Sequence, residues 1–392
     1  LDASGLGWQS GNNYDTNTAQ GWPDGTQTNA PGAGSGGCHG GIGARFSSYA
    51  QCKAYGRYDE AVWPGSGGGW YGSGEGGRGG GVIRVAAPDG VVTIDGVVAA
   101  NGTQSTSSTG GGGGGGAVHI AADTITGTGS VEAKGGNGGN AYGTAGGGGG
   151  RVVFDGYTAL GGSFAASPWL KVSTAGGYYP NGNNLAGGAG TIFFKGATDT
   201  WGTLIVDNAN QGSTQANSTP LVTAGTGQVD AIAAQGGGGG DRVDDLSQAW
   251  PTPNGLAGTW LRSDIGDSAT ATLTDDAVQM VVSNVNTRMF VLGAAAVSAV
   301  GKTYRGIVVL DQLEVRGYAK VRVEGDLLVY DGDVSHNVGG AVVSGASDGF
   351  YLSVGTGASV STANQLEVDG VTRTNITGTV TGSPLVCASG CP

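Results

Sequence analysis

Charged side chains are scarce in this 392-residue chain. They make up 12% of the residues, half of the roughly 25% that is usual in soluble domains. Lysine and arginine number 18 against 30 aspartates and glutamates, so the formal net charge is −12. A nucleic-acid-binding surface needs clustered basic residues, and here they are spread thinly. The composition therefore argues against nucleic acid as a partner and disfavours anionic membrane surfaces.

Long apolar runs and histidine are also lacking. No stretch approaches the ~18 consecutive apolar residues of a membrane span, so no membrane insertion is expected. No signal peptide is recognisable, and we interpret the chain as a mature protein or an excised fragment. The histidines number only three, His39, His119 and His336. A Ser-His-Asp hydrolase or a zinc enzyme is therefore not expected.

Cysteine occurs only four times, in two close pairs: Cys38 with Cys52, and Cys387 with Cys391. A four-cysteine zinc site is the alternative to disulfides, but neither spacing has the C-x-x-C form. We predict two disulfides that each close a short loop, as is usual in exported proteins.

Glycine, by contrast, is abundant, with 84 residues and long runs at 110–116, 146–150 and 236–240. The strict period of collagen is absent, and no Gly-Lys-Ser/Thr follows a run, which excludes a phosphate-binding P-loop. Ordering glycine costs more entropy than ordering any other residue, so these runs need mutual hydrogen bonds. Either they pack as arms against the rest of the fold, or they form a bundle of polyglycine helices with a flat surface. A third interpretation is that the backbone N–H groups of a glycine run form an anion-binding site.

Four segments repeat a common order of glycine run, short strand, polar turn, second strand and small-residue exit. The first strands align in two apolar columns, and the second strands are expected at 92–95, 131–134, 170–172 and 204–207. The first column holds Ile83, Val118, Val152 and Ile192, and the second holds Val85, Ile120, Phe154 and Phe194. The mixed column between them, Arg84, His119, Val153 and Phe193, is expected on the outer face, because side chains alternate along a strand.

These columns predict an all-β fold, a right-handed parallel β-helix (β-solenoid) with glycine-rich insertions and polyglycine-type arms. Three regions are expected. Residues 1–80 form an aromatic, disulfide-clipped cap, 81–240 the glycine-rich solenoid, and 241–392 a continuation with tighter coils. A separate β-sandwich over 241–392 is the alternative.

Several segments resemble a known group of proteins: 79–85 (GGGVIRV), 135–140 (GGNGGN), 187–195 (GGAGTIFFK) and 202–208 (GTLIVDN). They look like glycine-rich parts of large exported bacterial proteins with parallel β-helix, pectin-lyase-like regions, many of them adhesin-like. The resemblance covers residues 1–240 well and 300–335 weakly. It implies a scaffold and carries over no functional residue.

The N-terminal 80 residues are rich in aromatic side chains beside short polar ones. Flat rings can stack on sugar faces while amides and carboxylates bind the hydroxyl groups. The candidate ligand-binding residues are Trp22, Trp63, Trp70 and Tyr71. The competing interpretation is a cap, in which bulky rings seal the open end of a solenoid.

Paired carboxylates could serve glycoside hydrolysis or, with Ca²⁺, polysaccharide lysis. The candidates are Asp59 with Glu60, Asp241 with Asp244 and Asp245, Asp275 with Asp276, and Asp331 with Asp333. No basic partner recurs beside them, so solvated turn residues are the simpler reading. We assign no catalytic residue, no metal ligand and no cofactor, with Ca²⁺ left open.

The sequence therefore favours a non-enzymatic structural and adhesive scaffold, extracellular or on a bacterial cell surface. Its expected partner is a cell-surface glycan or another surface protein. The first alternative is a polysaccharide lyase or glycoside hydrolase on a β-helix fold. The second is an ice-binding protein or a phage-type receptor-binding protein with polyglycine arms.

Overall fold

Short runs of Val, Ile, Leu and Phe form the strands, and the fold is all-β, as predicted. The computed structural model describes the chain in stretches. These are residues 1–10, 31–46, 49–70, 75–140, 144–165, 168–179, 186–212, 217–234, 241–250, 255–263, 277–292, 300–323 and 325–330, and beyond them the strands from β21 to β28.

The four predicted first strands form one parallel ladder. They are β1 (Val82–Thr93), β3 (Ala117–Thr126), β5 (Arg151–Tyr157) and β8 (Thr191–Gly196), and the short β6 (Ala159–Leu160) also pairs with β3. Both apolar columns are in register. In the first column, Ile83 pairs with Val118, Val118 pairs with Val152, and Val152 pairs with Ile192. The predicted alignment of the first strands is confirmed, because the glycine runs place each strand at the same point of the repeat.

A second, smaller parallel ladder lies opposite the first. It consists of β2 (Val97–Ala99), β4 (Ser130–Glu132) and β7 (Val172–Ser173), and the 3-10 helices η2 (Gly162–Phe164) and η3 (Pro168–Lys171) precede β7. One buried cluster joins the two ladders, from Val98 and Val131 on one side to Ile120 and Phe154 on the other. The strands expected at 131–134 and 204–207 correspond to β4 and to β9 (Thr203–Asp207), although β9 joins the first sheet, antiparallel to β8, and not the second ladder. The strands expected at 92–95 and 170–172 were wrong, since Val92 belongs to β1 and residues 170–171 lie in η3.

The mixed column was predicted to face outward, and this holds for only half of it. Arg84 is exposed and His119 is half-buried, but Val153 and Phe193 are only 2% and 3% exposed. The Phe193 and Tyr58 rings pack in a T-shaped arrangement, with their centroids 5.4 Å apart. A distant N-terminal segment thus covers this face of β5 and β8, so the sheet is buried on both sides there.

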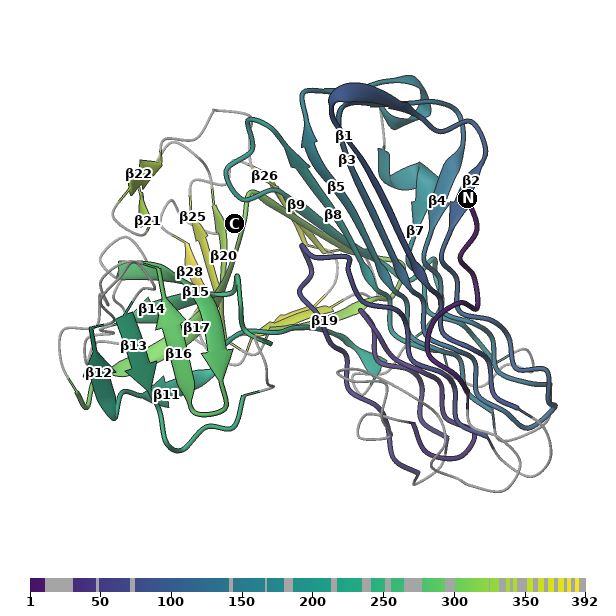
Figure 1. Cartoon of the computed structure of the whole chain (residues 1–392), viewed down its shortest axis with the longest axis horizontal. Helices are drawn as coiled ribbons and strands as arrows, with labels where there is room; N and C mark the ends of the chain where they lie inside the picture. Colours follow the sequence, from purple (N-terminus) through teal and green to yellow (C-terminus); the bar gives the residue numbers. More distant parts are fainter. Residues whose placement is uncertain are drawn as a thin grey trace.

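The glycine runs lie extended, side by side with other extended segments, and we call this assembly the glycine bundle (Figure 1). The hydrogen bonds that the N–H groups of run 110–116 donate follow a period of three: residues i and i+3 donate to the same neighbouring segment. The six N–H···O bonds, 2.7–3.1 Å long, join Gly111 to Gly69, Gly112 to Ala145, Gly113 to Thr103, Gly114 to Ser66, Gly115 to Gly148 and Gly116 to Ala100. Three residues per turn is the period of the polyproline II conformation.

The carbonyl groups of the same run accept bonds from three further segments. The donors are the N–H groups of Gly77 and Gly80 in one segment, Gly37 in a second, and Gly136 and Gly139 in a third. Run 110–116 is therefore hydrogen-bonded to six neighbouring segments, and most of its backbone groups are satisfied by other backbone groups. Residues 236–240, the third predicted run, lie outside the described residues.

Backbones approach so closely in the glycine bundle that a side chain would not fit. A Cβ added to Gly112 would lie 1.9 Å from the carbonyl oxygen of Gly136, and one added to Gly147 would lie 2.0 Å from that of Gly113. Glycine is needed here because neighbouring backbone segments of the same chain lie very close together, and not because the chain turns.

In the second half of the chain, strands stack in three parallel ladders. The first is β9, β18 (Gln312–Arg316), β23 (Tyr351–Val354) and β26 (Arg373–Ile376). The second is β10 (Thr219–Leu221), β19 (Lys320–Val323), β24 (Ser359–Thr362) and β27 (Thr379–Thr381). The third is β17 (Thr303–Leu310), β20 (Asp326–Tyr330), β25 (Leu366–Asp369) and β28 (Leu385–Cys387). Each passage of the chain thus adds one strand to each ladder.

Antiparallel strands lie between these passages. They are β11 (Thr226–Gln228), β12 (Ala231–Ala233), β13 (Asp241–Asp244), β14 (Trp260–Ser263), β15 (Ala277–Val285) and β16 (Arg288–Val291), and β21 (His336–Val338) pairs with β22 (Ala341–Val343). They enclose a separate buried cluster that includes Trp250, Leu261 and Tyr304. Pairing of β12 with β13 crosses the boundary predicted at residue 240.

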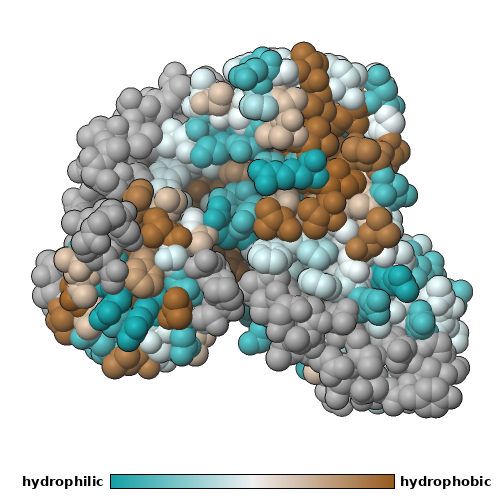
Figure 2. Space-filling view, in the orientation of Figure 1, coloured by the Kyte–Doolittle hydropathy of each residue, from teal (hydrophilic) through white to brown (hydrophobic). Residues whose placement is uncertain are grey.

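The outer strand of the first sheet, β1, leaves apolar residues on the surface. Figure 2 shows hydrophobic side chains gathered over this part of the molecule. Val82 is 40% exposed and Val91 63% exposed. Pro88 lies in β1, where the register with β3 shifts between Ala87 and Val91. A proline and an irregular register are features that discourage pairing at a sheet edge.

Candidate functional site

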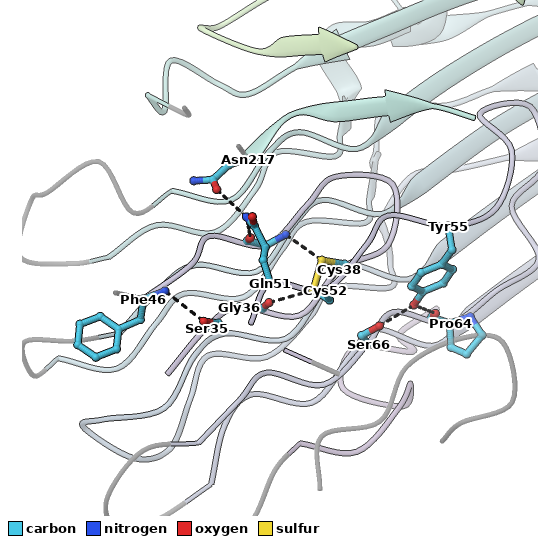
Figure 3. The surroundings of a disulfide bond; sticks show 11 residues. Ser35, Gly36, Cys38, Phe46, Gln51, Cys52, Tyr55, Pro64, Ser66 and Asn217 are labelled. Atoms are coloured by element: carbon cyan, nitrogen blue, oxygen red, sulfur yellow. Dashed lines mark hydrogen bonds between the residues drawn. A yellow bond between two sulfur atoms is a disulfide. The ribbon is translucent and has the colours of Figure 1, made fainter. Parts of the chain in front are cut away.

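The segment from Cys38 to Cys52 is a corner of the glycine bundle closed by a disulfide. The predicted Cys38–Cys52 bond is confirmed, and both residues are buried (Figure 3). The Gly43 N–H donates to Cys38 Sγ at 3.1 Å, while Gly41 N–H donates to Gly149 O. The corner is thus held against the bundle. The second predicted disulfide, Cys387–Cys391, involves side chains outside the described part of the chain.

His39 completes the backbone hydrogen bonding of run 110–116. The Gly37 N–H donates to Gly112 O. With a period of three, the next carbonyl that faces this segment is Gly115 O, and its donor is His39 Nδ1 at 2.9 Å. Burial lowers the pKa of His39 to about 3, so the ring is neutral at physiological pH. Its ring stacks on Tyr55 with the centroids 4.9 Å apart. The imidazole therefore replaces a backbone N–H and has a structural role.

Arg151 is fully buried where β5 leaves the glycine bundle. Its guanidinium donates to Tyr55 O at 2.8 Å, to Gly56 O at 2.7 Å and to Thr191 Oγ1 at 2.9 Å. Burial lowers its pKa to about 10, against the opposing effect of Asp59. The group therefore stays charged at neutral pH and ties the segment at 55–56 to β5.

A cleft of about 620 Å³ lies beside the disulfide corner, within the range of volumes that small ligands occupy. Four separate parts of the chain form its walls. They contribute Ile42 and residues 51–54, residues 220 and 222–225, residues 248–250 with Leu256, and Arg322.

Alternation along two paired strands explains which side chains face the cleft. Leu221 and Val321 are buried in the core on one side of β10 and β19. Pro220 and Arg322, which are paired residues on these strands, therefore point to the opposite side and line the cleft. The side of the sheet that faces the cleft is set by this alternation.

Trp250 forms a fixed part of the opposite wall. It is only 7% exposed, and its indole N–H donates to Ala224 O at 3.1 Å. Leu256 beside it is fully buried. The neighbouring turn is held to the N-terminal segment, because the Arg57 guanidinium donates to Ala257 O and forms an ion pair with Asp59. The cleft is thus preformed.

Polar side chains in the cleft come from several parts of the chain. The Gln51 amide donates to Gly43 O at 2.7 Å and to Asn217 Oδ1 at 2.8 Å, which orients it (Figure 3). Gln248 donates to Thr226 O at 3.2 Å. Among the described lining residues, the charged ones are Lys53 and Arg322, and both are exposed. The cleft therefore combines amides, an indole wall and positive charge.

Of the aromatic residues predicted from the sequence, the two that the structure describes, Trp63 and Trp70, do not line this cleft. Trp70 is only 8% exposed. Trp63 is partly buried beside Gly56, close to the Arg151 guanidinium. Trp22 and Tyr71 lie outside the described residues. The structure thus places the two described rings within the scaffold, and whether any of the four contacts a sugar stays a prediction.

Three of the predicted carboxylates have structural partners. Asp59 pairs with Arg57 at 2.8 Å, and Asp244 lies 2.9 Å from Arg242. Asp245 accepts a hydrogen bond from the Tyr304 hydroxyl at 2.8 Å. The pairs Asp275 with Asp276 and Asp331 with Asp333 lie outside the described residues.

Sequence reasoning missed the cleft residues, because nothing local marks them. Lys53 and Arg322 are brought to one cleft by segments about 270 residues apart. The proximity of Lys53 to Cys52 was a weak signal, since a disulfide holds its neighbours in place.

None of the family models, curated proteins or solved structures compared with the chain matches it. Over the described residues, no helix has the length and apolar character that would let it cross a membrane.

Proposed function

We propose that this protein is an extracellular adhesive scaffold of a bacterial cell surface that binds carbohydrate in the cleft beside the Cys38–Cys52 disulfide. The observation that carries the proposal is the cleft itself, with its oriented amides and fixed indole wall. Sugar-binding sites combine such hydrogen-bonding groups with an apolar surface. A disulfide is typical of proteins in oxidising compartments, which supports an extracellular location.

The architecture supports a scaffold role. The glycine bundle and the parallel ladders are held by backbone hydrogen bonds along the chain, which suits a rigid support for a binding cleft. We further propose that the stacked parallel ladders are coils of the right-handed β-helix that the sequence predicts, interrupted by the antiparallel strands β11 to β16.

A glycan-binding screen with a cleft-blocking variant tests this function. Ala249 lines the cleft and is exposed, so Ala249→Trp should fill the cleft without disturbing the core. The matched control is Ala234→Trp, at an exposed position away from the cleft. We expect the wild type and the control to bind the same glycans and Ala249→Trp to lose at least tenfold in affinity. Equal binding by all three proteins would contradict the proposal.

The same glycans should be followed for cleavage. Appearance of shorter products would support the alternative of a polysaccharide lyase or glycoside hydrolase on this fold.

The period-three hydrogen bonding of the glycine bundle favours a second candidate function, in which its regular surface binds ice or a receptor. Inhibition of ice recrystallisation that persists in Ala249→Trp would support this candidate over the cleft.

A further inference from the structure

We infer that two copies of this chain associate end to end at β1, and that each copy supplies residues 1–3 to the edge strand of the other. β1 is the end strand of the first sheet and β2 the end strand of the ladder opposite it, so both belong to the terminal layer of the stack. Figure 2 shows hydrophobic side chains gathered over this end of the molecule. Other residues line the cleft, so the inference stands apart from the proposed carbohydrate binding.

The core is open at this end of the stack. Val118 and Ile120 in β3 are fully buried, whereas their partners Ile83 and Val85 in β1 are only partly buried. Five exposed large hydrophobic residues lie at this end: Leu1 at 72%, Leu6 at 72%, Val82 at 40%, Val91 at 63% and Val97 at 54%. Exposed apolar residues that gather in one patch mark an interaction surface.

A further layer is begun on one side of this end and is missing on the other. Asp2 forms a parallel bridge with Ala99 of β2, and the Ala99 N–H donates to Leu1 O at 2.9 Å. The chain continues along the glycine bundle, where the Gly5 N–H donates to Asn101 O at 3.0 Å. Among the described strands, none pairs with β1 on its outer side. The N-terminal segment therefore builds half of a layer, and the place beside β1 is open.

The backbone of β1 offers hydrogen bonds at this open place. Gly81 O accepts a bond from the Ala117 N–H at 2.9 Å, and residues two apart along a strand bond to the same side. Val82, Arg84 and Ala86 therefore direct their N–H and C=O groups to the outer edge. The register with β3 is regular over these residues, before it shifts in the second half of β1. Such an edge is a template for another strand.

A second copy fits this place because a layer that is half built is complementary to itself. A twofold axis that runs along the strands, between the two ladders, carries residues 1–3 of one copy to the open side of β1 in the other. The Gly81 N–H donates to Ala3 O at 2.8 Å, so residues 1–3 lie level with the start of β1. Rotation about this axis keeps that level. The two half-layers then complete one shared layer.

The residues that meet in the shared layer are complementary. The exposed Leu1 of one copy comes to the exposed Val82 of the other. The acidic Asp2 of one copy comes to the level of the basic Arg84 of the other, and both residues are exposed. These apolar and charged contacts form twice, once on each side of the twofold axis.

Sedimentation equilibrium of the full chain tests the inference. We expect the wild type to be a dimer, and the double variant Leu1→Asp, Val82→Asp to associate at least tenfold more weakly, because charges would enter an apolar contact. The matched control is Leu170→Asp, Leu246→Asp, which changes two leucines that are 74% and 70% exposed away from β1. The control should dimerise like the wild type. Thermal unfolding verifies that each variant is folded.

A variant that lacks Leu1 and Asp2 separates the shared layer from direct pairing of two β1 strands. We expect this variant to be monomeric, because the shared layer needs these residues. In the wild type, the amides of Val82, Arg84 and Ala86 should exchange with solvent more slowly at about 100 µM than at about 1 µM protein, since dimers form with concentration.

Three results would overturn the inference: a wild type that stays monomeric at about 100 µM, a control variant that loses association as the edge variant does, or a dimer that survives the deletion of Leu1 and Asp2. Each of them would leave the cleft and its proposed ligand untouched.

Discussion

Individual polar residues in this protein are used as substitutes for missing backbone partners. His39 donates from its side chain to Gly115 O, at a place where the bundle would otherwise need a backbone N–H. Arg151 does the same for the carbonyl groups of Tyr55 and Gly56. A buried carbonyl without a donor costs about 1–3 kcal/mol, so each side chain removes a specific penalty.

Asp311 is a buried carboxyl group that should make stability depend on pH. Burial raises its pKa from 3.8 to about 6, although Gly202 and Trp201 N–H groups donate to it at 2.7 and 3.0 Å. Its charged surroundings are Asp199 and Lys195. The stability that the protonated form contributes is complete below pH ~4 and is lost as pH rises through 6.

Replacing Asp311 with Asn should remove this dependence and keep an acceptor for both N–H groups. We expect the free energy of unfolding of the wild type, relative to Asp311→Asn, to fall by about 2–3 kcal/mol between pH 4 and pH 8. Urea unfolding at both pH values measures it. A constant difference between the two proteins would show that Asp311 is ionised throughout.

At the scale of the element, glycine is required in each segment of the bundle because neighbouring backbones lie too close for a side chain. Gly112→Ala would place a Cβ 1.9 Å from Gly136 O, and the backbone on both sides would have to separate. We expect a loss of about 3–5 kcal/mol of stability, comparable to the largest effects of single substitutions. Thermal unfolding measures the effect.

The matched control for Gly112→Ala is Gly96→Ala. A Cβ at Gly96 would meet nothing within 4 Å. This change should be neutral or stabilise slightly, by up to about 1 kcal/mol, because alanine restricts the unfolded chain. Similar losses at both positions would mean that the bundle is not close-packed around Gly112.

At the scale of the whole molecule, the Cys38–Cys52 disulfide connects the glycine bundle with the cleft. Its loop spans 14 residues, for which loop entropy predicts about 3 kcal/mol of stabilisation. The double variant Cys38→Ser, Cys52→Ser should lose about 2–4 kcal/mol in denaturant unfolding. It should also bind glycans more weakly, because Gln51 and Lys53 are then less fixed.

Reduction of the wild type should reproduce the effect of this variant, and reductant should not affect the variant itself. Unchanged stability after reduction would show that backbone hydrogen bonds alone hold the corner.

The repeat in the sequence was enough to predict the ladder of β1, β3, β5 and β8. The columns from Ile83 to Ile192 and from Val85 to Phe194 appear in register, because strand alternation and the preceding glycine runs are both local features. The second strand of the first repeat was misplaced by about five residues, since the irregular register after Ala87 lengthens β1. Burial of Val153 and Phe193 could not be predicted, because Tyr58 covers them from a distant segment.

The sequence by itself determined the all-β class, the register of β1, β3, β5 and β8, the first disulfide and the need for glycine runs to bond with one another. All of these follow from spacing within a few tens of residues. Only the tertiary structure decided the sixfold surroundings of run 110–116, the antiparallel strands and the cleft. The physical reason is separation along the chain: Lys53 and Arg322 become neighbours of one cleft only when β10 pairs with β19 and the disulfide corner folds against them.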